Sequence, residues 1–223
     1  MTRMGGCAKA KCMDSLPALL VLICALCCVV SARAGTQIEE PLKDAVRTAL
    51  SSAVTNSAPP VPEFANTEAR LRYQRWLGVM NERLKKQHPD PNTRLEFLQT
   101  VWYESKRAGL DVSLVIGLIQ VESNFRKFAV SRSDARGYMQ VMPFWTRLLG
   151  DGDAGKLFHM QTNLRFGCTI LRHYLDREGG NLFMALGRYN GSPGQASYPN
   201  LVLGAKESLG IRDESSMSLA RHQ

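Results

Sequence analysis

Cysteine is scarce in the part of the chain that could fold into a domain. Five of the six cysteines lie within the first 28 residues, and only Cys168 follows them. A single cysteine cannot form an internal disulfide, so the fold cannot depend on a disulfide framework. Cys168 lies among apolar residues at helical spacing, which favours a small buried side chain over a nucleophile.

Strand patterns and the common cofactor and metal motifs are also missing. Apolar and polar residues do not alternate over any useful length, and there is no glycine-rich phosphate loop or nucleic-acid motif. The GDGD stretch at 150–153 is too short for a calcium loop. We therefore expect no cofactor, no metal site and no nucleic-acid partner; the histidines are scattered without ligand spacing, at His88, His159, His173 and His222.

Long apolar runs are absent as well. The longest one, Leu16–Val30, has fifteen residues and is shorter than the roughly 20 needed to span a bilayer. It follows a basic start and precedes a small-x-small motif at Ala32–Ala34, which together are typical of an export signal. The sequence predicts that residues 1–34 are a signal peptide cleaved after Ala34, that the protein is periplasmic, and that it keeps no stable membrane span. An uncleaved membrane anchor is the alternative.

The net charge of +8 is compatible with an anionic binding partner, but it does not show that such a partner is bound. Much of the excess lies in the segments ARLRYQRW and NERLKKQ. A basic surface of this kind fits an anionic polymer or an envelope surface, and a solvated helix face explains it equally well.

The rest of the chain divides into an extension, a main domain and a tail. Apolar residues recur at helical spacing over 42–54, behind a proline that suits a first helical turn, and TNSAPPVPE at 55–63 interrupts the pattern as a linker. We expect an N-terminal helix and Pro-rich linker over 35–62, one domain over 63–208 and a flexible tail over 209–223. Whether the N-terminal helix docks on the domain or on a partner stays open.

Helical periodicity and end signals recur through the main domain. Thr93 and Glu96 form a capping box that predicts a helix start, and Gly109 predicts its end. Residues 125–136 read as a polar loop. We expect an all-α fold, with helices over about 68–86, 93–108, 111–124, 164–178 and 181–189, and short helical turns over 137–142 and 143–149.

Glu122 ends a helix that is apolar on every side, VSLVIGLIQV. Such a helix is expected to be buried. The carboxyl group of Glu122, in its last turn, is then removed from water as well, which is unfavourable for a charged group. Burial and the unpaired carbonyls of the helix end both disfavour the charged form, and the pKa should rise. A glutamic acid still protonated near neutral pH can act as a general acid. The alternative is a helix-end glutamate that points into water.

Four motifs accompany this glutamate: ES at 122–123, Ser131, GYMQVMP at 137–143 and RYNGSPG at 188–194. Their combined spacing resembles the soluble lytic transglycosylases, which have a lysozyme-like helical fold. The resemblance covers about residues 93–205. It implies a lysozyme-like catalytic domain with an N-terminal helical extension.

The resemblance also implies roles for individual residues. Glu122 matches the single catalytic acid and base, and the other matching positions would bind the substrate. In the family these positions orient the reacting group, allow close approach of the glycan, line the groove or lie beside the acid; here they are Ser131, Gly137, Tyr138, Gln140, Met142, Tyr189 and Asn190. Met142 could equally be a packing residue, Gly137 a turn glycine and Asn190 a helix cap.

Three positions depart from the family pattern. Tyr138 stands where leucine is usual and could line a subsite, and Arg188 stands where alanine is usual. Asp134 replaces a glycine, and because aspartate tolerates left-handed backbone conformations it is read as a turn substitute. A second carboxylate near the cleft is the alternative for Asp134.

The activity that the resemblance implies is cleavage of the MurNAc-GlcNAc β-1,4 bond of peptidoglycan without water, giving 1,6-anhydro-MurNAc ends. Glycan strands would be the main partner, with envelope or secretion machinery as a further one. Two alternatives stay open: a hydrolase like the goose-type lysozymes, and a glycan-binding or assembly protein without turnover.

Overall fold

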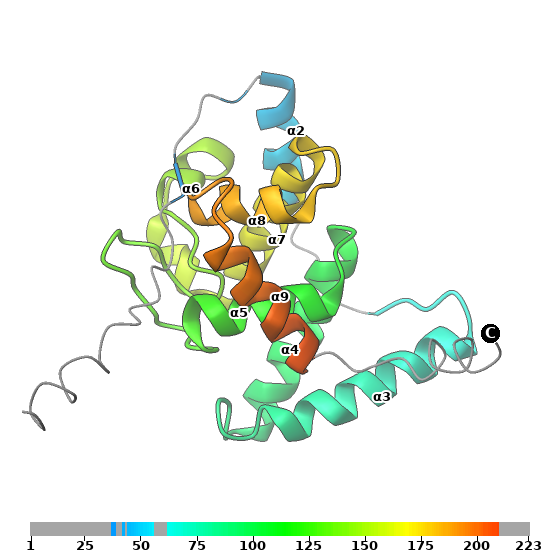
Figure 1. The fold of residues 1–223 in the computed structure, drawn as a ribbon. Helices are drawn as coiled ribbons and strands as arrows, with labels where there is room; N and C mark the ends of the chain where they lie inside the picture. Colours follow the sequence, from blue (N-terminus) through cyan, green and yellow to red (C-terminus); the bar gives the residue numbers. More distant parts are fainter. Residues whose placement is uncertain (1–36, 39–41, 43, 56–61, 210–223) are drawn as a thin grey trace, which may run out of the picture. The chain divides into compact units, whose positions relative to one another are not determined.

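Every regular element in the described part of the chain is a helix. The computed structural model describes residues 37–38, 42, 44–55 and 62–209. Figure 1 shows the helices in chain order; they are α2 (Asp44–Thr55), α3 (Thr67–Arg83), α4 (Pro91–Arg107), α5 (Val112–Ser123), α6 (Phe144–Leu149), the 3₁₀ helix η1 (Ala154–Phe158), α7 (Met160–Arg177), α8 (Leu182–Asn190) and α9 (Ser197–Leu209).

Several expectations fall on residues that lie outside these ranges. They are the signal peptide at 1–34, most of the linker, and nearly all of the tail, and they stay predictions. The chain divides into two units, 1–32 and 33–223, and all described residues belong to the second. Within the described ranges no helix is long and apolar enough to cross a membrane, and no cluster of His, Cys, Asp or Glu could hold a metal ion.

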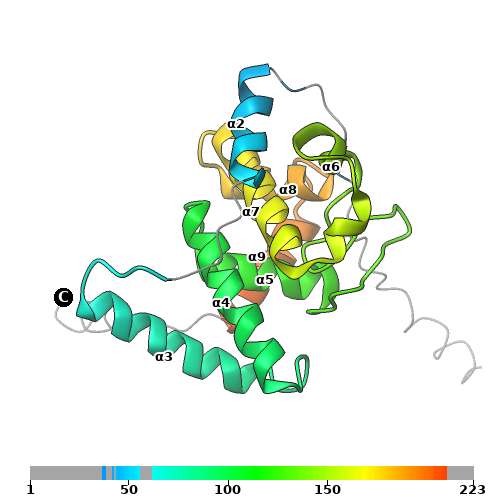
Figure 2. The same cartoon turned by 180° about the vertical axis from the view of Figure 1, so that it is seen from behind.

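α3 packs beside α4 through aromatic side chains. The ring of Trp102 on α4 lies 5.0 Å from that of Tyr73 and 5.0 Å from that of Trp76, both on α3. Figure 2 shows α3 running across one end of α4. Asp90 caps α4 by accepting a hydrogen bond from the Thr93 amide at 2.6 Å. The helix therefore begins at Pro91 and not at Thr93 as the capping box predicted, because proline suits the first helical position and aspartate the position before it.

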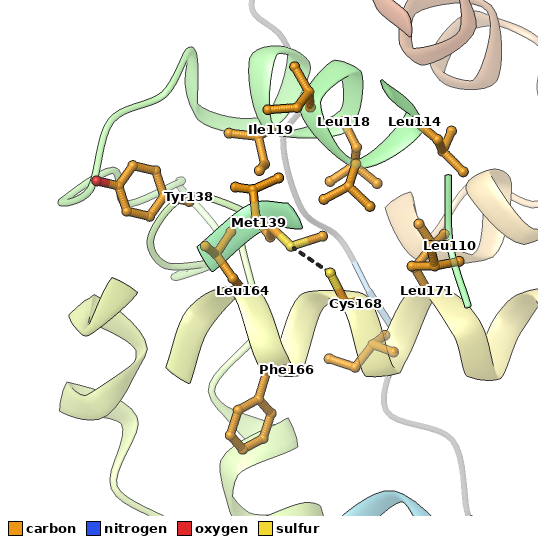
Figure 3. Packing of buried hydrophobic residues seen from close by; sticks show 14 of the residues in the cluster. Leu110, Leu114, Leu118, Ile119, Tyr138, Met139, Leu164, Phe166, Cys168 and Leu171 are labelled. Atoms are coloured by element: carbon orange, nitrogen blue, oxygen red, sulfur yellow. Dashed lines mark hydrogen bonds between the residues drawn. The ribbon is translucent and has the colours of Figure 1, made fainter. Parts of the chain in front are cut away.

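α7 lies at the centre of the helices and carries much of the core. Figure 3 shows Met139 between Leu118 of α5 and Cys168 of α7. The Met139 and Cys168 sulfurs are 4.0 Å apart, and both side chains have no exposed surface. Burial also raises the pKa of the Cys168 thiol. The interpretation of Cys168 as a small buried side chain is thus confirmed, since an inaccessible thiol is a poor nucleophile.

A buried ion-pair network connects the three helices α2, α4 and α7. The Glu104 carboxylate on α4 has no exposed surface and accepts hydrogen bonds from Arg165 on α7, at 2.8 and 3.0 Å. Its other oxygen accepts from Arg107 at 2.9 Å, and Arg107 also donates to the Ala53 carbonyl of α2 at 2.5 Å. α2 packs on α6 and α7. The N-terminal helix therefore docks on the domain, which answers the question that the sequence left open.

α9 is the one long helix of the described ranges that the sequence did not predict. It packs along α5, where Gly117 lets the two backbones approach closely. A Cβ at Gly117 would lie 2.6 Å from the Lys206 amide nitrogen and 3.0 Å from the Val202 carbonyl oxygen of α9. Because α9 follows the RYNGSPG motif directly, this packing also sets the position of the residues that follow that motif.

Candidate active site

Glu122 is buried at the end of α5, as the apolar helix predicted. The Asp111 carboxylate caps the start of the helix by accepting from the Ser113 amide at 2.8 Å. Asn124 ends it in a left-handed conformation with φ of 47°. Only 5% of Glu122 is exposed, and this burial raises the pKa of its carboxyl group to about 8. The carboxyl group is therefore protonated at neutral pH.

Tyr198 on α9 holds one oxygen of this carboxyl group. Its hydroxyl donates a hydrogen bond to Glu122 Oε1 at 2.5 Å, which opposes part of the pKa rise. Glu122 Oε2 is also buried, and no residue of the described ranges hydrogen-bonds to it. Since Oε1 is engaged as an acceptor, we expect the carboxylic proton on Oε2, from which it can be donated.

The GYMQVMP segment is tied to the end of α5 by hydrogen bonds. Ser123 donates through its hydroxyl to the Tyr138 carbonyl at 2.7 Å. Asn163 on α7 accepts from the Met139 amide at 2.8 Å and donates to the Arg136 and Leu157 carbonyls, each at 2.8 Å. The loop is thus fixed on both sides, and a site built from it is preorganised.

Tyr189 on α8 completes the surroundings of the acid. Its hydroxyl donates to the Met139 carbonyl at 2.8 Å and has no exposed surface. Burial and then the negative charge of Glu122 raise the pKa of the Tyr189 phenol well above its ordinary value. α5 and α9 therefore meet at one buried carboxyl group, and the charge of that group also acts on the Tyr189 phenol of α8.

Comparison with known proteins gives this arrangement a family. Residues 99–201, a range that includes Glu122, the GYMQVMP loop, Tyr189 and Tyr198, match the family described as "Transglycosylase SLT domain". This part of the chain matches a transglycosylase SLT domain. The prediction of an all-α, lysozyme-like fold of the lytic transglycosylase type is confirmed.

Individual relatives share the SLT domain over part of their length. The "Transglycosylase" of Enterobacteria phage PRD1 is 34% identical over 116 residues, covering 49% of this chain and 42% of that protein. The "Membrane-bound lytic murein transglycosylase C" of Edwardsiella ictaluri is 51% identical over 47 residues, covering 21% of this chain and 13% of that protein. That of Mannheimia succiniciproducens is 35% identical over 74 residues, covering 33% and 20%. The chain thus matches less than half the length of each of these relatives.

Two of the predicted binding residues, Gly137 and Gln140, stabilise the GYMQVMP loop in the structure. Gly137 has φ of 75°, and a Cβ there would lie 2.3 Å from Asn163 Nδ2 and 2.6 Å from the Leu157 carbonyl oxygen. The close approach at this glycine is therefore to the protein itself. Gln140 is 1% exposed, and its Nε2 donates to the Ala129 and Gly137 carbonyls at 3.1 and 3.0 Å.

Ser131 and Asp134 form a tight turn before this loop. Ser131 Oγ accepts from the amides of Ser133 at 3.2 Å and Ala135 at 3.0 Å. Asp134 has φ of 66°, and both of its carboxylate oxygens pair with Arg136, at 3.1 and 3.0 Å. This is the geometry expected of a residue that replaces a turn glycine.

The remaining predicted site residues differ in their burial and in their contacts. Tyr138 is 1% exposed, and its ring lies 4.9 Å from that of Phe97. It borders a cavity of about 510 Å³, together with Phe125 and the segment 126–130. Met142 is half-buried against the core. Asn190 ends α8 and donates from Nδ2 to Ser192 Oγ at 2.8 Å.

Two residues of the SLT domain site were missed by the sequence reasoning. Tyr198 belongs to none of the recognised motifs, and the sequence predicts no helix around it. Asn163 was not singled out at all, and a lone asparagine at the start of a helix gives no signal of its role. A search for buried helical polar side chains opposite the GYMQ turn could have found Asn163.

The raised pKa of Glu122 makes stability depend on pH. Glutamate has a pKa of 4.5 when unperturbed and about 8 in the folded protein, so between these values the folded state holds the extra proton. We expect the free energy of unfolding to fall as the pH rises from about 4.5 to about 8. Urea denaturation of the wild type and Glu122→Gln at several pH values measures this, because the variant lacks the titration.

A Tyr198→Phe variant provides the second arm of the pH experiment. Loss of the phenol hydrogen bond removes the interaction that lowers the Glu122 pKa, so the fall in stability should extend to higher pH. If the free energies of unfolding of the wild type and of Glu122→Gln changed in parallel over the whole pH range, a raised pKa of Glu122 would be contradicted.

Proposed function

We propose that the protein is a peptidoglycan lytic transglycosylase in which Glu122 is first the acid and then the base. One observation carries the proposal: a buried carboxyl group that accepts a hydrogen bond from a phenol stays protonated at neutral pH in an SLT domain. The names of the similar proteins, which include lytic murein transglycosylases, support peptidoglycan as the substrate.

Two other acidic side chains, Glu104 and Asp134, are engaged in ion pairs, which favours a mechanism with one carboxyl group. Glu104 is the other buried carboxylate of the described residues, and it is paired with Arg107 and Arg165. Asp134 is paired with Arg136, and its side chain is 55% exposed. Hydrolysis by most glycosidases needs a second free carboxylate, as nucleophile or to activate water.

The substrate itself can supply the missing group. Glu122 Oε2 would protonate the glycosidic oxygen as the bond to C1 of MurNAc breaks, and the 2-acetamido oxygen would support the positive charge at C1. The resulting carboxylate would then take the proton from the 6-hydroxyl of the same sugar, whose oxygen attacks C1. This gives a 1,6-anhydro ring without water, and the intramolecular attack avoids the entropic cost of a second reactant.

The location follows from the same proposal and from the N-terminal sequence. Peptidoglycan lies outside the cytoplasmic membrane, and the basic start, apolar run and Ala32–Ala34 motif are typical of export. We infer that the protein acts in the periplasm on glycan strands after cleavage of residues 1–34. The basic surface segments would suit contact with the envelope.

The product of peptidoglycan digestion tests the proposal. Purified protein that starts at Gly35 should release muropeptides that are lighter by one water than hydrolysis products and that resist reduction by borohydride. Mass spectrometry before and after reduction distinguishes the two. Products that end in reducing sugars would instead indicate a hydrolase like the goose-type lysozymes, and no release at all would indicate a glycan-binding protein.

A further inference from the structure

The cavity that Tyr138 borders lies next to the end of α5. Its volume is about 510 Å³, and its wall includes the segment 125–130, which follows Glu122 in the chain. Ser123, the neighbour of Glu122, donates to the Tyr138 carbonyl at 2.7 Å, and its own carbonyl accepts from Arg126 Nε at 2.9 Å. Hydrogen bonds therefore join two parts of the cavity wall to the helix turn that carries the acid.

Two cationic side chains, Arg126 and Lys127, line this cavity, and no acidic side chain is among its lining residues. None of the ion pairs within the described ranges includes either of them. Unpaired cations that line a cavity attract an anionic ligand, and both side chains can donate hydrogen bonds to a carboxylate.

The other titratable side chains of the cavity wall are uncharged at neutral pH. Burial and the positive charge of Arg94 lower the pKa of His88. Burial and the negative charge of Glu96 raise the pKa of the Tyr138 phenol to about 12. Glu96 itself is exposed on α4 and is not one of the lining residues. The wall therefore carries a net positive charge.

Exposed apolar side chains border the same cavity. Of the exposed large apolar side chains in the described ranges, Phe128 has the highest exposed fraction, 71%, and Val130 is 56% exposed. The Phe128 ring lies 5.9 Å from that of Phe158, and Lys127 Nζ lies 5.3 Å from its centroid. Apolar side chains that gather at a cavity are typical of a binding surface. A ligand that combines aliphatic groups with negative charge would match this wall.

We propose that this cavity binds the peptide stem of peptidoglycan, with Arg126 and Lys127 donating to one of its carboxylates. The stem is attached to the lactyl group of MurNAc, the sugar whose bond Glu122 would cleave, and it carries aliphatic side chains and free carboxylates. A volume of about 510 Å³ exceeds what a lone carboxylate needs, which favours the stem over the lactyl carboxylate of a stem-free glycan. The inference rests on the proposed function, because it takes peptidoglycan to be the substrate.

Binding without turnover tests this role. The probes are the tetramer of N-acetylglucosamine, the stem-free tetrasaccharide of alternating GlcNAc and MurNAc, and the same tetrasaccharide with L-Ala-D-Glu on each MurNAc. Each is titrated into Glu122→Gln protein by calorimetry. Adding Lys127→Ala should weaken binding of the stem-bearing tetrasaccharide about tenfold, as for a lost hydrogen bond to a charged group, and leave the other two affinities unchanged. Adding Lys127→Arg instead should keep the affinity, because the charge is retained.

Lys106→Ala is the matched control. Lys106 Nζ lies 5.0 Å from the centroid of the Trp102 ring, an arrangement like that of Lys127 on Phe128, but it does not line the cavity. All three affinities should stay unchanged in this variant. If Lys127→Ala weakened the stem-bearing and stem-free tetrasaccharides equally, or weakened neither, the inference would be overturned. A wild type that releases no anhydro products would instead reject the proposed function, and an effect confined to the stem-bearing probe would still establish stem binding.

Discussion

Glu122→Gln should leave the protein folded and slow peptidoglycan cleavage by about a thousandfold, the middle of the range for loss of a general acid. Glutamine has the shape of the protonated acid, so Tyr198 can still donate to the oxygen at the Oε1 position. The amide cannot release a proton to the glycosidic oxygen or later take one up. Release of soluble muropeptides per unit time measures the effect, and circular dichroism measures the fold.

Asp134→Asn is the matched carboxyl-to-amide control. The Asp134 side chain is 55% exposed and pairs with Arg136 in a turn, so its loss should change the rate by less than about threefold, as for a surface ion pair. A loss at Asp134 as large as that at Glu122 would show that a second carboxylate takes part. A Glu122→Gln protein with full activity would reject Glu122 as the acid.

Gly117→Ala should lower the free energy of unfolding by about 2 kcal/mol, because it overpacks the contact between α5 and α9. The new Cβ would lie 2.6 Å from the Lys206 amide nitrogen, a backbone atom that cannot move without its helix. α9 must therefore shift, and the hydroxyl of Tyr198 would shift with it from Glu122. We expect a loss of cleavage rate in addition to the loss of stability, measured by urea denaturation and by muropeptide release.

Gly78→Ala on α3 shows what the same substitution does where there is space. Apart from its chain neighbours and the nearby backbone of its own helix, no described atom lies within 4 Å of a Cβ built at Gly78, and alanine is the better helix former. The expected change is a gain of about 0.5–1 kcal/mol with unchanged activity. Equal gains in stability for Gly117→Ala and Gly78→Ala would contradict the close contact between α5 and α9.

The buried acid could be predicted from sequence because its signal is local. α5 is apolar on every side, which requires burial of the whole helix, and Glu122 lies within its last turn. α7 and α8 were also predicted, since Gly179 and Gly180 follow the first and Asn181 caps the second through the Met184 amide at 3.1 Å. Local periodicity and capping residues suffice for such elements.

Features that depend on distant contacts could not be predicted in this way. α9 contains Pro199 and shows no clear apolar stripe, and its position depends on the missing side chain at Gly117 of another helix. Tyr198, the hydrogen-bond partner of the acid, was therefore missed. Gln37 gave no signal either, because its burial results from the docking of α2 and the indole of Trp145, which lies 108 residues further along the chain.

The docking of α2 has a practical consequence for anyone who trims the protein. A cut at residue 62, the domain boundary that the Pro-rich stretch suggests, would strip Leu50 and Val54 from the hydrophobic surface they cover and deprive Arg107 of its acceptor on Ala53. The shortened polypeptide would expose apolar area and aggregate more readily. The smallest stable fragment should therefore begin at or before Gln37.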